Sequence, residues 1–163
     1  MNKLNPAHIL LVEDNPADAR LVCEALREHR ILTEVHHVPD GEEALAFLSR
    51  EPPYTDAPRP DLVFLDLNLP KVDGHQVLDH MKGADALRQI PVVVLTSSDA
   101  DEDVKRAYEG HVNSYVTKPM DFDKFLALIQ DLGIYWFSVV RLPTQAQGHR
   151  GRDPDTSDDR PAE

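Results

Sequence analysis

Five short apolar runs, separated by segments with helical spacing, constrain the fold of this chain more than any other feature. They lie at residues 9–12, 35–38, 62–65, 92–95 and 115–117. Between the first two runs, apolar residues recur three or four positions apart, as on one face of a helix. Strand alternating with helix predicts βαβ units, and unbroken apolar runs such as 62–65 are typical of parallel strands covered on both faces. The sequence therefore predicts an α/β fold with a doubly wound, five-stranded parallel sheet.

Local signals mark where several helices begin. Asn15 precedes Pro16, a pair typical of a helix cap and a first helical position. Residues 40–43 resemble a capping box at the start of the second helix. Asp121 is expected to begin the last helix. The inward apolar residues of that last helix are expected to be Phe122, Phe125, Leu126 and Ile129.

Composition narrows the class of protein. At 163 residues and 41% hydrophobic, the chain is long and apolar enough for one domain with a real core. A net charge of −12 argues against binding to nucleic acid or to an anionic membrane surface, which both require clustered positive charge. The single cysteine, Cys23, excludes an internal disulfide, and we see neither a signal segment nor a membrane span. A soluble, cytoplasmic protein is expected.

Polar side chains follow four of the predicted strands directly. Glu13 and Asp14 follow the first strand, Asp66 follows the third, Thr96 closes the fourth, and Lys118 follows the fifth. Ligands of open parallel sheets bind beyond the carboxyl ends of the strands, so these groups are expected at one edge. Three clustered acids repel one another unless a cation lies among them, and oxygen ligands of this kind suit Mg²⁺. Such a carboxylate can attack a phosphoryl group, and a lysine can neutralise the product.

This pattern resembles the receiver domain of bacterial two-component systems over residues 7–135. The resemblance implies a flavodoxin-like fold with strand order 2-1-3-4-5. It implies that Asp66 is the phosphoacceptor, and that Thr96 and Lys118 contact the phosphoryl oxygens. It also implies a Mg²⁺ site in which Asp14 and Asp66 bind the metal, Glu13 assists through water, and the backbone carbonyl of Asn68 is a further ligand. One departure is Glu13, where many receivers have aspartate.

Two further features follow from the same resemblance. The Lys118–Pro119 peptide bond is expected to be cis, and Tyr115 lies at the aromatic position that changes rotamer when receivers are phosphorylated. An aromatic residue in a sheet is more often simply part of the core, and for Tyr115 both interpretations stay open.

Two segments resemble the small, single-domain regulators that partner bacterial phytochromes. These are the proline-rich stretch 52–60 and the apolar C-terminal extension 136–143. The extension either folds back on the last helix or, with that helix, forms a symmetric homodimer. The proline-rich stretch is otherwise a tolerated surface loop. Residues 144–163 contain almost nothing apolar and are expected to be disordered.

The expected function is that of a single-domain response regulator. A histidine kinase, of phytochrome type, supplies the phosphoryl group, and the signal leaves through protein contacts because no output domain is apparent. The chain would catalyse only its own phosphorylation and dephosphorylation. Two alternative functions fit the sequence less well. A haloacid-dehalogenase-type phosphatase needs a second acid where Asn68 stands, and a flavodoxin-type module needs a Ser/Thr/Gly-rich loop where the acids of residues 13–14 would repel phosphate.

The eight histidines do not suggest a metal site in the sequence. His36 and His37 are adjacent in a strand and therefore point to opposite faces. His75 and His80 are five positions apart, which is a poor helical spacing for sharing a ligand. We expect no cluster of histidine and cysteine ligands, and a packing role for Cys23.

Overall fold

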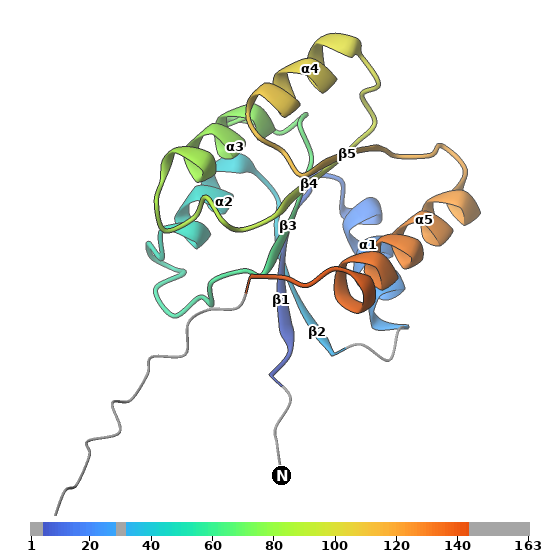
Figure 1. Ribbon diagram of the computed structural model, residues 1–163, viewed down its shortest axis with the longest axis horizontal. Helices are drawn as coiled ribbons and strands as arrows, with labels where there is room; N and C mark the ends of the chain where they lie inside the picture. The colour runs from blue at the N-terminus through green and yellow to red at the C-terminus, as the bar shows by residue number, and fades with distance from the viewer. Residues whose placement is uncertain (1–4, 29–31, 144–163) are drawn as a thin grey trace, which may run out of the picture.

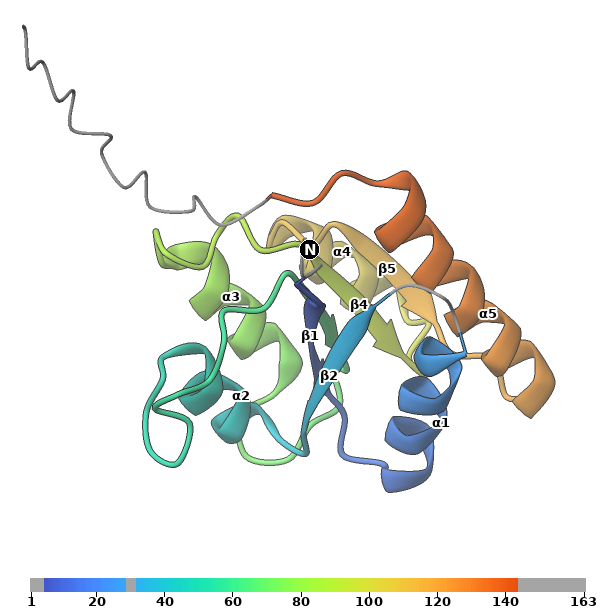
Figure 2. The same cartoon turned by 90° about the horizontal axis from the view of Figure 1, so that it is seen from below.

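A parallel five-stranded sheet forms the centre of the computed structural model, which describes residues 5–28 and 32–143. The strand order is β2-β1-β3-β4-β5, as predicted, and every neighbouring pair is parallel. The strands are β1 (Ala7–Val12), β2 (Thr33–Val38), β3 (Leu62–Leu65), β4 (Val92–Thr96) and β5 (Ser114–Thr117). On one face lie α2 (Gly41–Leu48), α3 (Gly74–Gly83) and α4 (Asp101–Glu109), and on the other α1 (Pro16–Arg27) and α5 (Phe122–Ile134) (Figures 1 and 2). The α/β, flavodoxin-like prediction is confirmed.

The unbroken apolar runs follow from burial on both faces of the central strands. In β3, Val63 and Leu65 pack toward α2, α3 and α4, whereas Leu62 and Phe64 pack toward α1 and α5. All of these side chains are fully buried. Burial of an aliphatic or aromatic side chain stabilises the fold by about 1.5–3 kcal/mol each, so the sheet is a rigid base for the loops at its ends.

The helix starts mostly follow the sequence signals. The Asn15 side chain accepts hydrogen bonds from two backbone amides of α1, and Asp121 accepts one from the amide of Lys124. At α2, Asp40 caps the amide of Glu43, but the reciprocal bond of a capping box is not part of this cap. The complete capping box belongs to α3, between Asp73 and Gln76. The box predicted at residues 40–43 was therefore only half right.

The C-terminal part of the fold differs from the prediction in one residue. Phe125 and Ile129 are buried, but Phe122, the first residue of α5, is 64% exposed. A π-helical turn, η1 (Tyr135–Val139), continues α5, and Trp136 is buried in the core on the α1–α5 side. The chain after η1 turns back across the end of the sheet (Figures 1 and 2). The predicted disordered tail lies outside the described residues.

The peptide bond before Pro119 is not cis. Among the described residues, the one cis peptide bond is Pro52–Pro53. The cis prediction for Lys118–Pro119 was wrong, and the physical reason is simple. An X–Pro bond prefers trans by about 0.5–1 kcal/mol, and the Lys118–Pro119 bond has this preferred form.

Within the same described ranges, the structure contains no helix with the length and apolar character needed to cross a membrane.

Candidate functional site

The predicted acids meet at the carboxyl edge of the sheet. Val12 lies opposite Leu65 in the β1–β3 register, so the residues that follow these two strands emerge side by side. Glu13 and Asp66 are buried, at 3% and 5% exposure, whereas Asp14 is exposed. Each of the three offers a carboxylate oxygen, and these oxygens all lie within 4.8 Å of one another. Three oxygen donors so close together fit a hard divalent cation.

Lys118 is the counter-charge of this cluster. Its ammonium nitrogen lies 2.6 Å from Oε2 of Glu13, and 3.1 Å from both Oδ2 of Asp66 and Oδ2 of Asp18. The lysine side chain is only 8% exposed. Asp18 is not among the site residues predicted from the sequence. The available signal was an acid in the first turn of a helix that begins at this same edge.

Burial and neighbouring charges shift the pKa values of Glu13 and Lys118. Burial raises the pKa of Glu13 to about 7, although its hydrogen bond from Lys118 opposes the change. For Lys118, burial disfavours the charged form, but the hydrogen bond to Glu13 and the charges of Asp66 and Glu13 outweigh it and raise the pKa of the ammonium. The lysine therefore stays protonated while the acids around it compete for one cation.

Both oxygens of Asp66 are held in place. Oδ1 accepts a hydrogen bond of 2.9 Å from the hydroxyl of Thr96 and one of 3.2 Å from the backbone amide of Asn68. Oδ2 accepts from Lys118 at 3.1 Å. Thr96 is itself fully buried at the end of β4, and its carbonyl accepts a hydrogen bond from the amide of Lys118. The carboxylate is thus oriented by donors from three different segments of the chain.

The loop after β3 depends on a close approach of two backbones. A Cβ on Gly74 would lie 2.2 Å from the carbonyl oxygen of Asp66, nearer than real Cβ atoms come. The amide of Gly74 donates to the carbonyl of Leu67 at 3.0 Å. Because only glycine fits there, the start of α3 can press against the residue that carries the buried carboxylate.

A second series of hydrogen bonds lies beside the one around Asp66. The Tyr115 hydroxyl donates to the backbone carbonyl of Ser98 at 2.7 Å, and the Ser98 hydroxyl donates to Oδ2 of Asp103 at 2.6 Å. Nε2 of the buried His75 lies 3.2 Å from Oδ1 of Asp103. The hydrogen bonds from Ser98 and His75 lower the pKa of Asp103. This series of hydrogen bonds joins β5, the loop after β4, α4 and α3. No sequence pattern pointed to a role for His75 in it.

The assembled site contains the residues predicted for it. At one edge of the sheet gather the side chains of Glu13, Asp14, Asp66, Thr96 and Lys118. Tyr115 belongs to the neighbouring series of hydrogen bonds. The roles of these residues, and the Asn68 carbonyl as a metal ligand, stay predictions.

The sheet order and this set of acids, hydroxyl and lysine define a class of protein. The chain belongs to the response regulator receiver domain family, whose family model matches residues 9–130. Members of this family are phosphoacceptor switches with a divalent-metal site in the acidic pocket.

Individual relatives cover most of the chain. Response regulator Rcp1 of Synechocystis sp. is 46% identical over 138 residues, which are 85% of this chain and 94% of Rcp1. The crystal structure of the Mn²⁺-bound form of Rcp1 is similar with a TM-score of 0.83 and 45% identity, over 85% of this chain and 100% of that one. The structure of the phosphorylated cyanobacterial phytochrome response regulator RcpA gives a TM-score of 0.84 at 44% identity, over 86% of this chain and 100% of that one.

Proposed function

We propose that Asp66 accepts a phosphoryl group from the phosphohistidine of a histidine kinase, in a reaction that requires Mg²⁺. The observation that carries this proposal is the environment of the Asp66 carboxylate. It is buried, and both of its oxygens receive hydrogen bonds, from Thr96 and Asn68 on one side and from Lys118 on the other. A carboxylate so oriented can present one oxygen in line with an incoming phosphorus atom.

The transfer exchanges one bond for another. An oxygen of Asp66 bonds to phosphorus, and the bond between phosphorus and the kinase imidazole nitrogen breaks. The electron pair of that bond stays on the imidazole, and the product on this chain is an acyl phosphate. Lys118 and the Thr96 hydroxyl then hold phosphoryl oxygens through charge and hydrogen bonding. Lys118 must leave Glu13 and Asp18 at least in part to do so.

Glu13, Asp14, Asp66 and the carbonyl of Asn68 would hold the Mg²⁺ ion, Glu13 through water. The bound ion supplies neutralisation of the charge that develops on the phosphoryl oxygens. The residues of the chain determine its place. Two of these carboxylates are buried, and burial, with a smaller contribution from the charge of Asp66, raises the pKa of Glu13, so a bound cation would favour its ionised form.

Phosphorylation would be read out through the chain of hydrogen bonds beside the site. When Thr96 moves toward the phosphoryl group, the loop after β4 moves with it, and Ser98 lies two residues further along that loop. Ser98 is the partner of Tyr115 and of Asp103, so the change reaches β5 and α4. A local change of charge thereby shifts a surface between two arrangements.

The donor we propose is a phytochrome-type histidine kinase. The support is the similarity to RcpA, a cyanobacterial phytochrome response regulator, at 44% identity over 86% of this chain. The proposed location of this phosphotransfer is the cytoplasm. Apart from its own phosphorylation and dephosphorylation, the chain would catalyse no reaction, because Asn68 replaces the second acid of an Asp-based phosphatase.

Phosphotransfer from purified kinases tests this proposal. A phytochrome-type kinase carrying labelled phosphohistidine should pass its label to the wild-type chain within the first time points, and an unrelated histidine kinase should do so far more slowly. Asp66→Asn should receive none, whereas Asp123→Asn, at an exposed position of α5, should behave as wild type. Equal transfer from both kinases would remove the phytochrome link, and transfer to Asp66→Asn would remove the acceptor assignment.

We further propose a receiver domain of residues 7–135 that forms a homodimer through α5 and the extension 136–143. The support is a set of exposed apolar side chains along this element. They are Phe122, Ile134, Tyr135 and Val139, at 64%, 43%, 52% and 69% exposure. Trp136 of the same element is buried in the hydrophobic core on the α1–α5 side. One side of the extension therefore packs against the domain, and the other side exposes apolar surface.

Sedimentation equilibrium of the full chain tests the dimer. The wild type should sediment as a dimer, and Tyr135→Ser with Val139→Ser should shift it to monomer. Tyr108→Ser is the matched control, since Tyr108 is a similarly exposed aromatic residue of α4. A wild type that remains monomeric at high concentration contradicts the proposal.

A further inference from the structure

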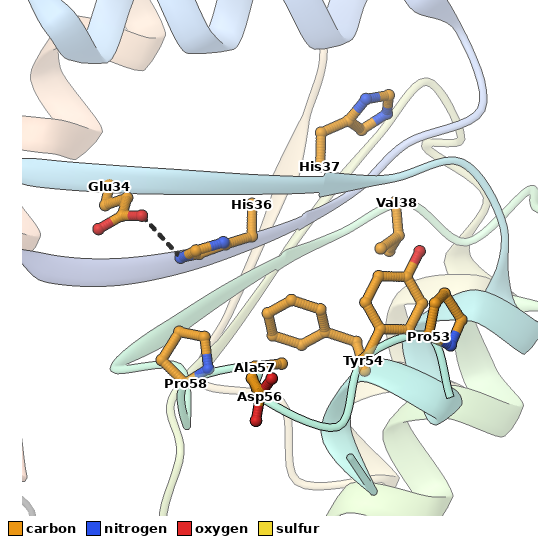
Figure 3. A pocket seen from close by; sticks show the side chains of 10 residues that line it. Glu34, His36, His37, Val38, Pro53, Tyr54, Asp56, Ala57 and Pro58 are labelled. Atoms are coloured by element: carbon orange, nitrogen blue, oxygen red, sulfur yellow. Dashed lines mark ion pairs between the residues drawn. The ribbon is translucent and has the colours of Figure 1, made fainter. Parts of the chain in front are cut away.

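Two histidines and a glutamate meet at the opposite end of the sheet from Asp66. His8 lies opposite Glu34 in the register of β1 and β2, and His36 follows Glu34 by two residues on the same face of β2. Figure 3 shows Glu34 and His36 on one side of β2 and His37 on the other. The sequence analysis separated His36 from His37 correctly but overlooked His8, which comes from the neighbouring strand. The prediction of no histidine metal site considered spacing within single elements, and the pairing of β1 with β2 adds a contact that such spacing does not include.

The three side chains are close enough to share one ion. Nδ1 of His8 lies 3.1 Å from Nε2 of His36. Oε2 of Glu34 lies 3.7 Å from Nδ1 of His8, and Oε1 of Glu34 lies 3.9 Å from Nε2 of His36. Each residue offers one ligand atom, and these three atoms all lie within 4.8 Å of one another. Both imidazoles are mostly shielded, with side-chain exposures of 26% and 22%.

These separations resemble those of a tetrahedral zinc site. With Zn–N and Zn–O bonds of about 2.0–2.2 Å, tetrahedral geometry sets neighbouring ligand atoms about 3.3 Å apart. The imidazole pair already lies near that distance, and the carboxylate reaches it by a small rotation of an exposed side chain. Imidazole nitrogens favour zinc-type ions, whereas Mg²⁺ prefers an all-oxygen set such as the one around Asp66.

The surroundings leave room for a further ligand. Glu34 and His36 line a hollow of about 500 Å³ whose other walls include Phe47, Tyr54 and Asp56, the last two from the proline-rich loop (Figure 3). The ring of Phe47 packs against that of His36, with centroids 5.4 Å apart, and restricts its orientation. Three protein ligands beside an open hollow is the pattern of a site that keeps one coordination position for water or another small ligand.

We propose that His8, Glu34 and His36 form a second metal site, which takes a divalent transition ion of the zinc type. The ion would link the edge strand β2 to β1, the strand whose other end leads into Glu13. This site is independent of the phosphorylation chemistry, since it shares no residue with the acidic pocket.

Zinc binding to the tag-free, full-length chain tests the proposal. Isothermal titration with Zn²⁺, in excess Mg²⁺ to occupy the acidic pocket, should show one bound Zn²⁺ per chain. His8→Asn and His36→Asn should each weaken binding at least about 100-fold, more than the loss of an outer-shell partner usually costs. Co²⁺ should give the intense visible bands of a four-coordinate site in the wild type and lose them in both variants.

Further variants distinguish Zn²⁺ binding at this cluster from binding elsewhere on the chain. His80→Asn removes an exposed imidazole outside the cluster and should bind Zn²⁺ as the wild type does. Asp66→Asn should also bind normally. Glu34→Gln changes an exposed side chain, so it reports on the site even if a histidine variant fails to fold. The proposal is overturned if the wild type binds no Zn²⁺ in excess Mg²⁺, if Asp66→Asn abolishes binding, or if His8→Asn and Glu34→Gln leave it unchanged.

Discussion

The ammonium nitrogen of Lys118 lies 3.1 Å from Oδ2 of Asp66, although the two residues are 52 positions apart in the chain. The same nitrogen lies still closer to Glu13, at 2.6 Å. One lysine therefore provides the positive charge for the whole acidic pocket when no metal ion is present. Stability, pH dependence and phosphorylation all depend on this arrangement.

Replacing Lys118 by methionine should destabilise the metal-free protein. The change leaves Glu13, Asp18 and Asp66 close together without their cation, and breaking a buried ion pair in this way costs about 3–5 kcal/mol. Urea unfolding in a chelator at mildly alkaline pH should show this loss, and added Mg²⁺ should restore part of it. Lys105→Met removes a lysine that is 79% exposed and should cost less than about 1 kcal/mol. Equal losses for the two variants would contradict the assignment.

The metal-free protein should become less stable as the pH rises from about 4.5 to about 7, through Glu13. The folded-state pKa of Glu13 is raised above its unfolded value, so in this window the native state holds a proton that the unfolded chain releases. The free energy of unfolding, measured by urea titrations across the window with chelator, should decline by on the order of 2 kcal/mol more in the wild type than in Glu13→Gln. Parallel pH profiles of the two proteins would show that Glu13 titrates normally.

Gly74→Ala should disturb the phosphorylation loop. The new Cβ would meet the carbonyl of Asp66 at 2.2 Å, so the loop or the start of α3 must shift. We expect a loss of about 1–3 kcal/mol in the free energy of unfolding. Gly83→Ala, at the other end of the same helix, meets nothing within 4 Å and should be neutral or slightly stabilising. If both variants unfold at the same urea concentration, the close approach is unimportant.

Tyr115→Phe separates a switch role from simple packing. It removes the 2.7 Å hydrogen bond to Ser98, which should cost about 1 kcal/mol, while the ring stays in place. Hydrogen exchange of α4 should change on phosphorylation in the wild type and change much less in Tyr115→Phe. Tyr108→Phe, on an exposed residue, serves as the control. An unaltered response in Tyr115→Phe would leave Tyr115 as a core residue only.

The sequence predicted much of the fold because parallel strands impose a simple order. Runs such as 62–65 could only be strands covered on both faces, and the residues that follow parallel strands must meet at one edge. Glu13 and Asp66 could therefore be placed together without coordinates. The prediction for Phe122 failed because helical spacing does not tell which turns of a helix pack against the core.

Other features required three-dimensional information. His8 and His36 meet only because β1 and β2 pair in a particular register, which no local pattern reveals. Asp18 reaches Lys118 across the edge of the sheet, a contact between positions 100 residues apart. The cis prediction for Lys118–Pro119 came from family resemblance, and the residues around that bond carry no signal of their own.

Intact mass after incubation with acetyl phosphate shows whether Asp66 is the phosphoacceptor. The wild-type chain should gain the mass of one phosphoryl group when Mg²⁺ is present and none when a chelator removes the metal. Asp66→Asn should gain none under either condition, and Asp123→Asn should gain as much as the wild type. A phosphoryl adduct on Asp66→Asn, or an adduct on the wild type that forms equally well without a divalent metal, would contradict these predictions.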